Sequence, residues 1–291
     1  MSRALKSFEY FEPRTVEEVV RILFMYGGEA KVLAGGVDLV PKMRKRQIQP
    51  KCLVSIQRIP GIDYIASDGA EGLRIGALTS LRSIELSPTI RKDYELLHEA
   101  IHQIASIQVK NMGTAVGNLC VATPASDIAL PLLVLGAKLR IVGLTQERNV
   151  PIEKFFIGVG QTVLQPSEIV TEVLLPSPPA ATGGAFLKLV RTATDVAKVN
   201  VAVTVTVTDG ICQDVKIALG SVAPTPIRAN KAEEALKGKK LDQETIAEAA
   251  ETAAEETKPI DDIRSTAEYR KEVTKVLVRR AIEKASKRAK A

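Results

Sequence analysis

The spacing of apolar residues near the start of the chain predicts a helix. Apolar side chains recur at helical spacing after Thr15, and Glu18 stands three residues beyond that threonine. This pair is typical of a capping box, and the Gly27-Gly28 pair is a typical helix end. We therefore expect a helix that begins at Thr15 and ends at Gly27.

Two short apolar runs follow, at 31–33 and 53–56. Runs of this length between turn residues predict buried strands. Between them lies a helical pattern through 42–46, which Asp38 can cap. Together these elements predict a small β-α-β subdomain that ends near Arg58.

The pattern then changes. Apolar residues at 64–66 and 73–76, separated by a Ser-Asp-Gly turn, predict a β-hairpin. Helices at 81–86, 96–105 and 128–135 and strands at 138–142 and 168–175 are expected after it. The run Pro176-Ser-Pro178-Pro179 reads as a linker. We therefore expect a first domain over 1–176, with subdomains at about 1–58 and 59–176.

Residues 199–208 show the clearest strand pattern in the chain, with valine at every second position and mostly threonine between. Asp209-Gly210 predicts a tight turn into a second antiparallel strand at 211–219. Helices are expected at 229–236 and 243–255 and from Ser265 or Thr266 onward. The fold class is therefore α+β, with a smaller second domain at 177–291 built from an antiparallel sheet and helices.

Composition narrows the class of protein. The 291 residues are 45% hydrophobic, which is enough for a substantial core. No run approaches the roughly 18 apolar residues that span a bilayer, so we expect a cytoplasmic protein without an integral membrane segment. The three cysteines lie far apart, so any iron–sulfur cluster must belong to another polypeptide.

The net charge of +6 is concentrated at one end. Ten Lys and Arg face three Glu between Arg264 and Ala291, whereas the other 263 residues hold thirty basic and thirty-one acidic side chains. With 4% aromatic residues and no basic stripe elsewhere, nucleic-acid binding is not expected. The basic end is interpreted as the solvated face of a surface helix.

Two glycine-bearing loops carry the candidate chemistry. One follows the strand at 31–33 and contains Gly35 and Gly36, and the other contains Gly113 and Gly117 within the stretch 109–135. Glycine permits torsions and close approaches that a Cβ forbids, so peptide N–H groups can converge on an anion. Two such loops suggest a ligand with an extended phosphate portion.

At these residues the sequence resembles a known family. The carrying motifs are Ala34-Gly35-Gly36-x-Asp38-Leu39-x-Pro41, Thr114-x-x-Gly117-Asn118 with Asp127 nine residues later, Arg191-Thr-Ala-Thr-Asp195-Val-Ala, Gly220-Ser-Val-Ala-Pro224-Thr-Pro226-Ile-Arg228-Ala and Pro259-Ile-Asp-Asp262-Ile-Arg264-Ser-Thr-Ala-Glu-Tyr269-Arg270. They resemble the FAD-binding medium subunits of molybdenum hydroxylases, the carbon monoxide dehydrogenase, xanthine dehydrogenase and aldehyde oxidoreductase family. Val116 stands where that family usually has a glycine.

The resemblance implies an FAD-binding domain of the PCMH type, followed by a C-terminal domain of the carbon monoxide dehydrogenase flavoprotein type. It implies noncovalent FAD, with residues 33–39 on one side of the diphosphate, 114–118 on the other, Asp127 at the adenosine part, Ile75 against the isoalloxazine and Lys188 as a further contact. The full implied set is Leu33, Ala34, Gly35, Gly36, Val37, Asp38, Leu39, Ile75, Thr114, Ala115, Val116, Gly117, Asn118, Asp127 and Lys188. No catalytic or metal-binding residue is implied in this chain.

The resemblance also implies the role of an electron-transfer subunit in an oxidoreductase. A large partner would hold the molybdenum cofactor and a small partner the [2Fe–2S] clusters, in a dimer of heterotrimers. Electrons would reach the FAD of this chain from the clusters and leave for an external acceptor.

Three other interpretations stay open. The chain could be a self-sufficient FAD-dependent oxidase, or a scaffold that has lost its flavin. His98-Glu99-x-x-His102 matches the zinc-protease helix, but these are the only two histidines, and Asp127 is the one nearby third ligand downstream. Gly158-Val-Gly160 begins like a dinucleotide fingerprint and lacks its later glycine, so it is interpreted as a structural loop.

Overall fold

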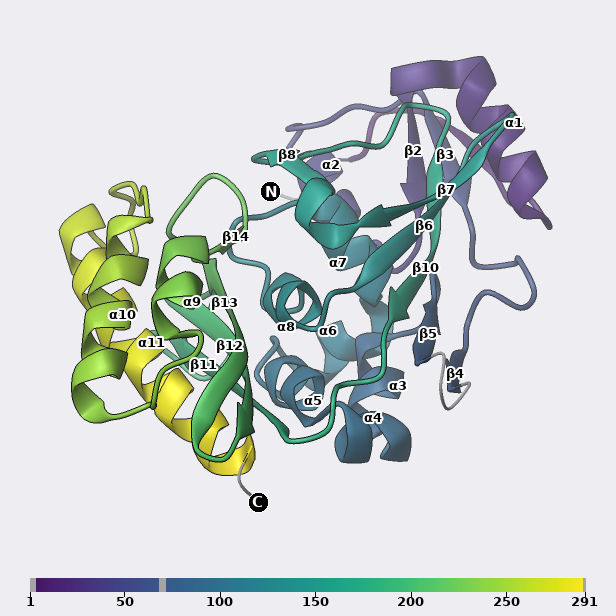
Figure 1. Ribbon diagram of the computed structural model, residues 1–291. Coiled ribbons are helices and arrows are strands. Elements are labelled where there is room, and N and C mark those ends of the chain that lie inside the picture. Colours follow the sequence, from purple (N-terminus) through teal and green to yellow (C-terminus); the bar gives the residue numbers. More distant parts are fainter. Residues whose placement is uncertain (1–3, 68–71, 290–291) are drawn as a thin grey trace.

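The structure, a computed structural model, describes residues 4–67 and 72–289. This part of the chain forms three main sheets and a two-stranded hairpin, with helices packed between and around them (Figure 1). The expected mixture of helices and strands is thereby confirmed. The turn expected at 67–69 extends beyond the described residues.

The first sheet belongs to a small α/β unit. Its elements are β1 (Glu9–Phe11), α1 (Val16–Tyr26), β2 (Ala30–Leu33), α2 (Leu39–Arg44) and β3 (Cys52–Ser55), with strand order β1-β3-β2 and parallel pairing throughout. The expected cap is present, since Thr15 Oγ1 accepts from Glu18 N at 3.2 Å. The strand β1 was not expected, and Asp38 makes no side-chain cap hydrogen bond to α2, so that expectation was wrong.

The second sheet is five-stranded, antiparallel and ordered β4-β5-β10-β6-β7. Its strands are β4 (Ile65–Ser67), β5 (Leu73–Gly76), β6 (Lys138–Val142), β7 (Glu147–Pro151) and β10 (Ile169–Leu175). Six helices are inserted between β5 and β6: α3 (Leu81–Leu86), α4 (Pro88–Asp93), α5 (Glu95–His102), α6 (Ile107–Met112), α7 (Ala115–Val121) and α8 (Ala129–Val134). The small hairpin is β8 (Phe156–Gly158) with β9 (Gln161–Thr162), and two short 3-10 turns lie at Gly27–Glu29 and Ile152–Lys154. The glycines interpreted as a structural loop thus lie in this hairpin.

The third sheet is antiparallel and ordered β11-β12-β13-β14. Its strands are β11 (Thr182–Leu189), β12 (Val199–Thr208), β13 (Ile211–Gly220) and β14 (Ile227–Arg228), followed by α9 (Asn230–Leu236), α10 (Gln243–Glu255) and α11 (Ala267–Ala289). Asp209 and Gly210 both have positive φ, 50° and 77°, as the tight turn requires. Thr266 Oγ1 accepts from Tyr269 N and caps α11 as expected.

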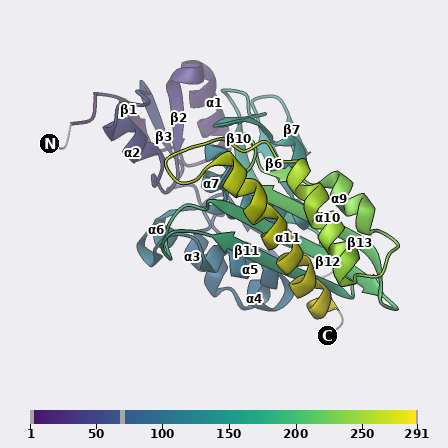
Figure 2. The same ribbon diagram turned by 90° about the vertical axis from the view of Figure 1, so that its left-hand side faces the viewer.

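Both faces of β12 are covered. Its valines pack in the core beneath α9, α10 and α11, which lie across one face of the sheet (Figure 2). The other face carries Asn200, Ala202 and Thr204 and lies against α5 and α8 (Figure 1). The alternation therefore distinguishes two buried faces, of which the more polar one meets the rest of the protein.

The core of the first domain extends into this third sheet. Phe186, Ala202 and Ala218 belong to the same apolar cluster as the α8 residues Leu130 and Leu133.

Among the described residues, no helix is long and apolar enough to cross a membrane.

Candidate functional site

The first glycine loop leaves the carboxyl end of β2 and enters α2. It is held at its start by β3, because Ile56 N donates to Leu33 O at 3.1 Å and Gln57 Nε2 donates to Ala34 O at 2.9 Å. Gly36 has φ +70°, which favours glycine, and its carbonyl accepts from Val40 N at 3.1 Å. The loop therefore has a fixed path between strand and helix.

The peptide N–H groups of this loop are its main chemical feature. Those of residues 34–39 donate to no acceptor among the residues that the structure describes. The loop is only half-buried, apart from the exposed Asp38. A row of available peptide donors beside a positive-φ glycine is suited to an anion such as a diphosphate.

The second glycine loop joins α6 to α7. Thr114 is the N-cap of α7, and its Oγ1 accepts from Gly117 N at 3.0 Å while its carbonyl accepts from Asn118 N at 3.0 Å. Two of the expected donors are thus used within the first turn of α7. Ala115 and Val116 are 1% and 6% exposed, so the branched side chain of Val116 points into the core.

The two loops are in direct contact. A Cβ built on Gly35 would lie 1.7 Å from Met112 O, at the end of α6, so only glycine fits there. The segment after β5 holds the second loop, since Leu81 N donates to Gly113 O at 2.8 Å and Ala115 N to Thr79 O at 3.4 Å. Glycine at position 35 therefore lets the first loop pack with its backbone directly against the end of α6.

Ile75, which precedes that segment, is placed differently from the loops. Its side chain is 1% exposed and belongs to the apolar core. The structure therefore brings the backbone after Ile75 to the second loop, while the Ile75 side chain itself packs inward.

Asp127, in the turn between α7 and α8, is brought together with Lys188 on β11. Lys188 Nζ donates to Asp127 Oδ2 at 2.6 Å and Asn200 Nδ2 donates to Asp127 Oδ1 at 2.8 Å, all three being buried. Burial raises the pKa of Asp127, against the opposing effect of Lys188 and Asn200. Ser126 Oγ accepts from Ala129 N, at the start of α8, at 3.2 Å and donates to Asn118 Oδ1 at 2.6 Å.

Sequence reasoning missed Gln57 and Asn200. Gln57 directly follows a buried strand that ends beside the first loop, and this position is the only signal for its role. Asn200 is an amide in a face otherwise made of threonine and alanine, and this break in the pattern is the one sequence signal for its role. In the structure it is 0% exposed and lies where the two domains meet.

The His98-Glu99-x-x-His102 helix is confirmed as α5, but its polar groups are engaged elsewhere. Glu99 Oε1 accepts from Lys284 Nζ at 2.9 Å and from Arg288 Nη2 at 2.6 Å, and His102 Nδ1 lies 2.9 Å from Glu85 Oε1. The described residues contain no group of three His, Cys, Asp or Glu placed to hold a metal. The protease interpretation therefore has no structural support.

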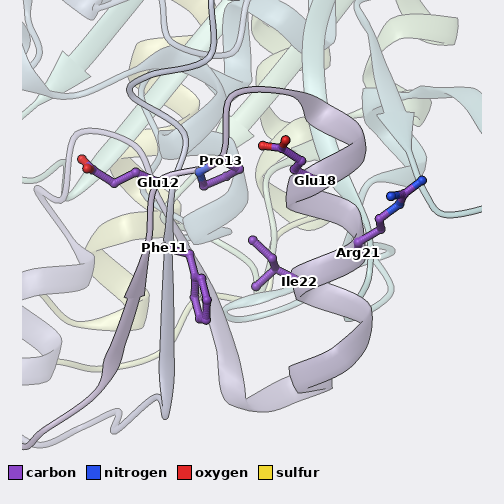
Figure 3. A pocket seen from close by; sticks show the side chains of 6 residues that line it. All are labelled: Phe11, Glu12, Pro13, Glu18, Arg21 and Ile22. Carbon is purple, nitrogen blue, oxygen red and sulfur yellow. The ribbon is translucent and has the colours of Figure 1, made fainter.

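A surface hollow of about 370 Å³ lies between β1 and α1. Figure 3 shows Phe11 and Ile22 facing each other there, with Glu18 and Arg21 along α1. Its lining also includes Glu12 and Pro13, and none of these residues belongs to a glycine loop. The hollow is open and shallow and is separate from the candidate site.

Comparisons with known proteins identify both parts of the chain. Residues 6–178 match the FAD binding domain in molybdopterin dehydrogenase, and residues 184–285 match the CO dehydrogenase flavoprotein C-terminal domain. The carbon monoxide dehydrogenase medium chain of Hydrogenophaga pseudoflava is 34% identical over 94% of this chain and 96% of its own length. The nicotine 6-hydroxylase medium subunit of Paenarthrobacter nicotinovorans is 30% identical over 98% of this chain and 99% of its own.

Solved structures agree. Carbon monoxide dehydrogenase from Hydrogenophaga pseudoflava matches with a TM-score of 0.96 and 36% identity, covering 98% of this chain and 99% of that one. Quinoline 2-oxidoreductase from Pseudomonas putida matches with a TM-score of 0.93 and 29% identity, covering 99% and 100%. The chain belongs to the FAD-binding medium subunits of molybdenum hydroxylases such as carbon monoxide dehydrogenase, an oxidoreductase family in which molybdenum and iron–sulfur cofactors lie on other subunits.

Proposed function

We propose that this chain is the electron-transfer subunit of a molybdenum hydroxylase, holding FAD noncovalently between its two glycine loops. The observation that carries the proposal is the row of unpaired peptide donors at residues 34–39 beside the contact of Gly35 with α6. The bound flavin would supply the redox chemistry, taking electrons from the [2Fe–2S] clusters of a small partner and passing them to an external acceptor.

The residues of the chain bind and orient the cofactor. The N–H groups of the first loop, with those of Thr114 and Val116 in the second, would donate to the diphosphate. Each such charge-assisted hydrogen bond contributes about 1.5–3 kcal/mol, so several suffice without a covalent bond. Because Gly117 and Asn118 N–H groups are used within α7, most donors would come from the first loop.

Asp127, Lys188 and Asn200 would close the other side of the site. Their buried hydrogen bonds join the α7–α8 segment to β11 and β12, so the adenosine part would be held where the two domains meet. Ile75 would support the isoalloxazine through the segment that follows it, since its side chain lies in the core.

We further propose that the chain works in the cytoplasm as part of a dimer of heterotrimers, with a small [2Fe–2S] subunit and a large molybdenum subunit. Its three cysteines are free and separate, and the described residues contain no group of three His, Cys, Asp or Glu placed to hold a metal, which supports electron donation from another polypeptide. The relatives act on substrates as different as carbon monoxide and nicotine. Substrate choice would therefore belong to the large partner.

One experiment tests the proposal in two steps. Acid precipitation of the purified holoprotein should release FAD into the supernatant, because no covalent bond holds it. The flavin of the isolated chain should be reduced by a chemical reductant but not by a small aldehyde or purine, and addition of both partner subunits should restore substrate-driven bleaching.

Flavin that stays in the acid pellet would contradict noncovalent binding. Substrate oxidation by the isolated chain near the median enzyme rate of about 10 per second would instead favour the self-sufficient oxidase.

A further inference from the structure

A buried lysine anchors the helix that leads into the second glycine loop. All six residues of α6 are described, and Lys110 is the one among them that is buried. Ile107 and Met112 on the same helix are 54% and 61% exposed. Short helices depend on tertiary contacts, usually through an apolar face. Here a charged group provides the main buried contact.

The partner of this lysine is an equally buried glutamate. Lys110 Nζ donates to Glu85 Oε1 at 2.6 Å and to His102 O at 3.2 Å, and both charged side chains are 5% exposed. Glu85, on α3, also receives Arg82 Nη1 at 2.7 Å and His102 Nδ1 at 2.9 Å. Burial alone would raise the pKa of Glu85, but these hydrogen bonds lower it to about 2. Glu85 is therefore ionised at neutral pH, and its pair with Lys110 joins α6 to α3 and α5.

The ion pair lies close to both glycine loops along the chain. Lys110 precedes Gly113 by three residues, and Leu81 at the start of α3 donates its N–H to Gly113 O. The last residue of α6, Met112, has its carbonyl oxygen 1.7 Å from the place where a Cβ of Gly35 would stand. A shift of α6 would therefore move the second loop and also change the surface on which the first loop rests.

We propose that Lys110 and Glu85 are a positioning pair for the flavin site: their buried ion pair fixes α6 and thereby the separation of the two glycine loops. Both side chains are 5% exposed and would act through α6 rather than on the cofactor itself. The inference rests on the proposed function, because it requires these loops to hold the diphosphate.

The test replaces Lys110 in the full chain and measures FAD. Lys110→Met keeps the length of the side chain and removes the charge, whereas Lys110→Arg keeps the charge. The readouts are the dissociation constant of FAD and the visible circular dichroism of the bound flavin, in the isolated chain or the assembled complex, whichever binds FAD in the wild type. We expect Lys110→Met to weaken FAD binding at least about tenfold and to change the flavin dichroism. A tenfold effect corresponds to the loss of roughly one charged hydrogen bond between the displaced loops and the diphosphate. Lys110→Arg should stay within about threefold of the wild type.

Two controls separate positioning from general stability. Lys51→Met breaks an exposed pair of similar length, 2.7 Å to Glu29, and should leave FAD binding unchanged. Glu233→Gln disturbs another buried pair, 2.6 Å from Arg228 and remote from the loops, and should lower the melting temperature without changing the flavin dichroism.

If Lys110→Met gives no folded protein, Glu85→Gln provides the same test, since it removes the charge and keeps a hydrogen-bond acceptor. Equal weakening of FAD binding by Glu233→Gln and the Lys110 variant would overturn the inference, as would wild-type binding and dichroism in Lys110→Met. A wild-type protein that binds no FAD would overturn the proposed function, and this inference with it.

Discussion

A single methyl group at Gly35 would meet the backbone of another loop. The nearest atom to its Cβ would be Met112 O at 1.7 Å, and a backbone atom cannot move aside as a flexible side chain can. We expect Gly35→Ala to separate the two loops and to reduce FAD retention at least about tenfold, because several diphosphate contacts depend on one geometry. FAD per chain after gel filtration measures this.

Gly28→Ala is the matched control, since nothing lies within 4 Å of its added Cβ and its φ is not positive. It should retain FAD like the wild type. Equal FAD content in the two variants would show that close contact at Gly35 is not needed for binding.

The buried carboxylate of Glu85 predicts a pH dependence. Its pKa is lowered from 4.5 to about 2 in the folded protein, so between these values the unfolded chain binds more protons. Stability from Glu85 is therefore present above pH 4.5 and is lost as the pH falls toward 2. The difference in melting temperature between wild type and Glu85→Gln should be largest near neutrality and shrink below pH 4.5. A difference that stays constant across this range would contradict the assignment.

At the residue scale, the local sequence predicted the glycine-bearing loops, the Thr15 cap and the Asp209-Gly210 turn. Each of these depends on backbone torsions and on residues that are close in the chain. The pairing of Asp127 with Lys188 was different. Each residue was expected near the cofactor, but the bond between them spans 61 positions and depends on how β11 docks. The hydrophobic pattern and the spacing of motifs along the chain do not show which distant residues a docked strand brings into contact.

The helix α5 shows how an element can be identified while its role is missed. It was expected as a helix, and its motif suggested zinc. Its Glu99 instead binds Lys284 and Arg288 near the end of α11, and accepts from Phe186 N at 3.3 Å. The interpretation of the basic end as only a solvated face was therefore wrong for these two cations, because docking of α11 was not visible in the charge pattern.

Loss of this contact should destabilise the protein measurably. Glu99 is partly buried and binds two cations, so Glu99→Ala should lower the free energy of unfolding by about 1.5–3 kcal/mol. Denaturant titration of the full chain measures the change.

Glu251→Ala is the control, at an ion pair between α10 and α11. Glu251 binds Lys275 at 2.8 Å but is 60% exposed, and exposed pairs contribute less than about 1 kcal/mol. If Glu99→Ala lowers the free energy of unfolding no more than Glu251→Ala does, the ion pairs between α5 and α11 contribute no more than an exposed pair.

The short helices α4, α6 and α7 were not predicted from the sequence, and the strands that were missed are mostly short or lie at a sheet edge. β1, β8, β9 and β14 have two or three residues each, too few to show periodicity. β11 is longer, but Thr182 is its one β-branched residue, whereas valine and threonine marked β12. Gly183 is required there because its Cβ would lie 2.1 Å from Ala285 O on α11, a long-range contact.

At the scale of the whole molecule, the domain boundary at residue 176 stays a prediction. A boundary in the sequence does not require that the two parts fold independently. The larger core includes Phe186, Ala202 and Ala218 from the third sheet. A fragment of residues 1–176 would expose the apolar residues of α8 that these side chains cover. We expect it to bind a hydrophobic dye and to lack a cooperative thermal transition.

The full chain is the comparison for that fragment and should unfold cooperatively without dye binding. A fragment that melts cooperatively and binds FAD would show instead that the third sheet is dispensable for the first core.

The burial of α8 also has a consequence for synthesis. All six residues of this helix are buried, and β12 and β13 provide part of its cover. The 88 residues that follow Leu130, up to Ala218, would take roughly 4–18 s to translate at about 5–20 residues per second. During that interval the apolar helix α8, which follows α7, lacks part of its cover on the nascent chain. This is the stage at which a chaperone would be most useful, and FAD would find its site complete only after it has passed.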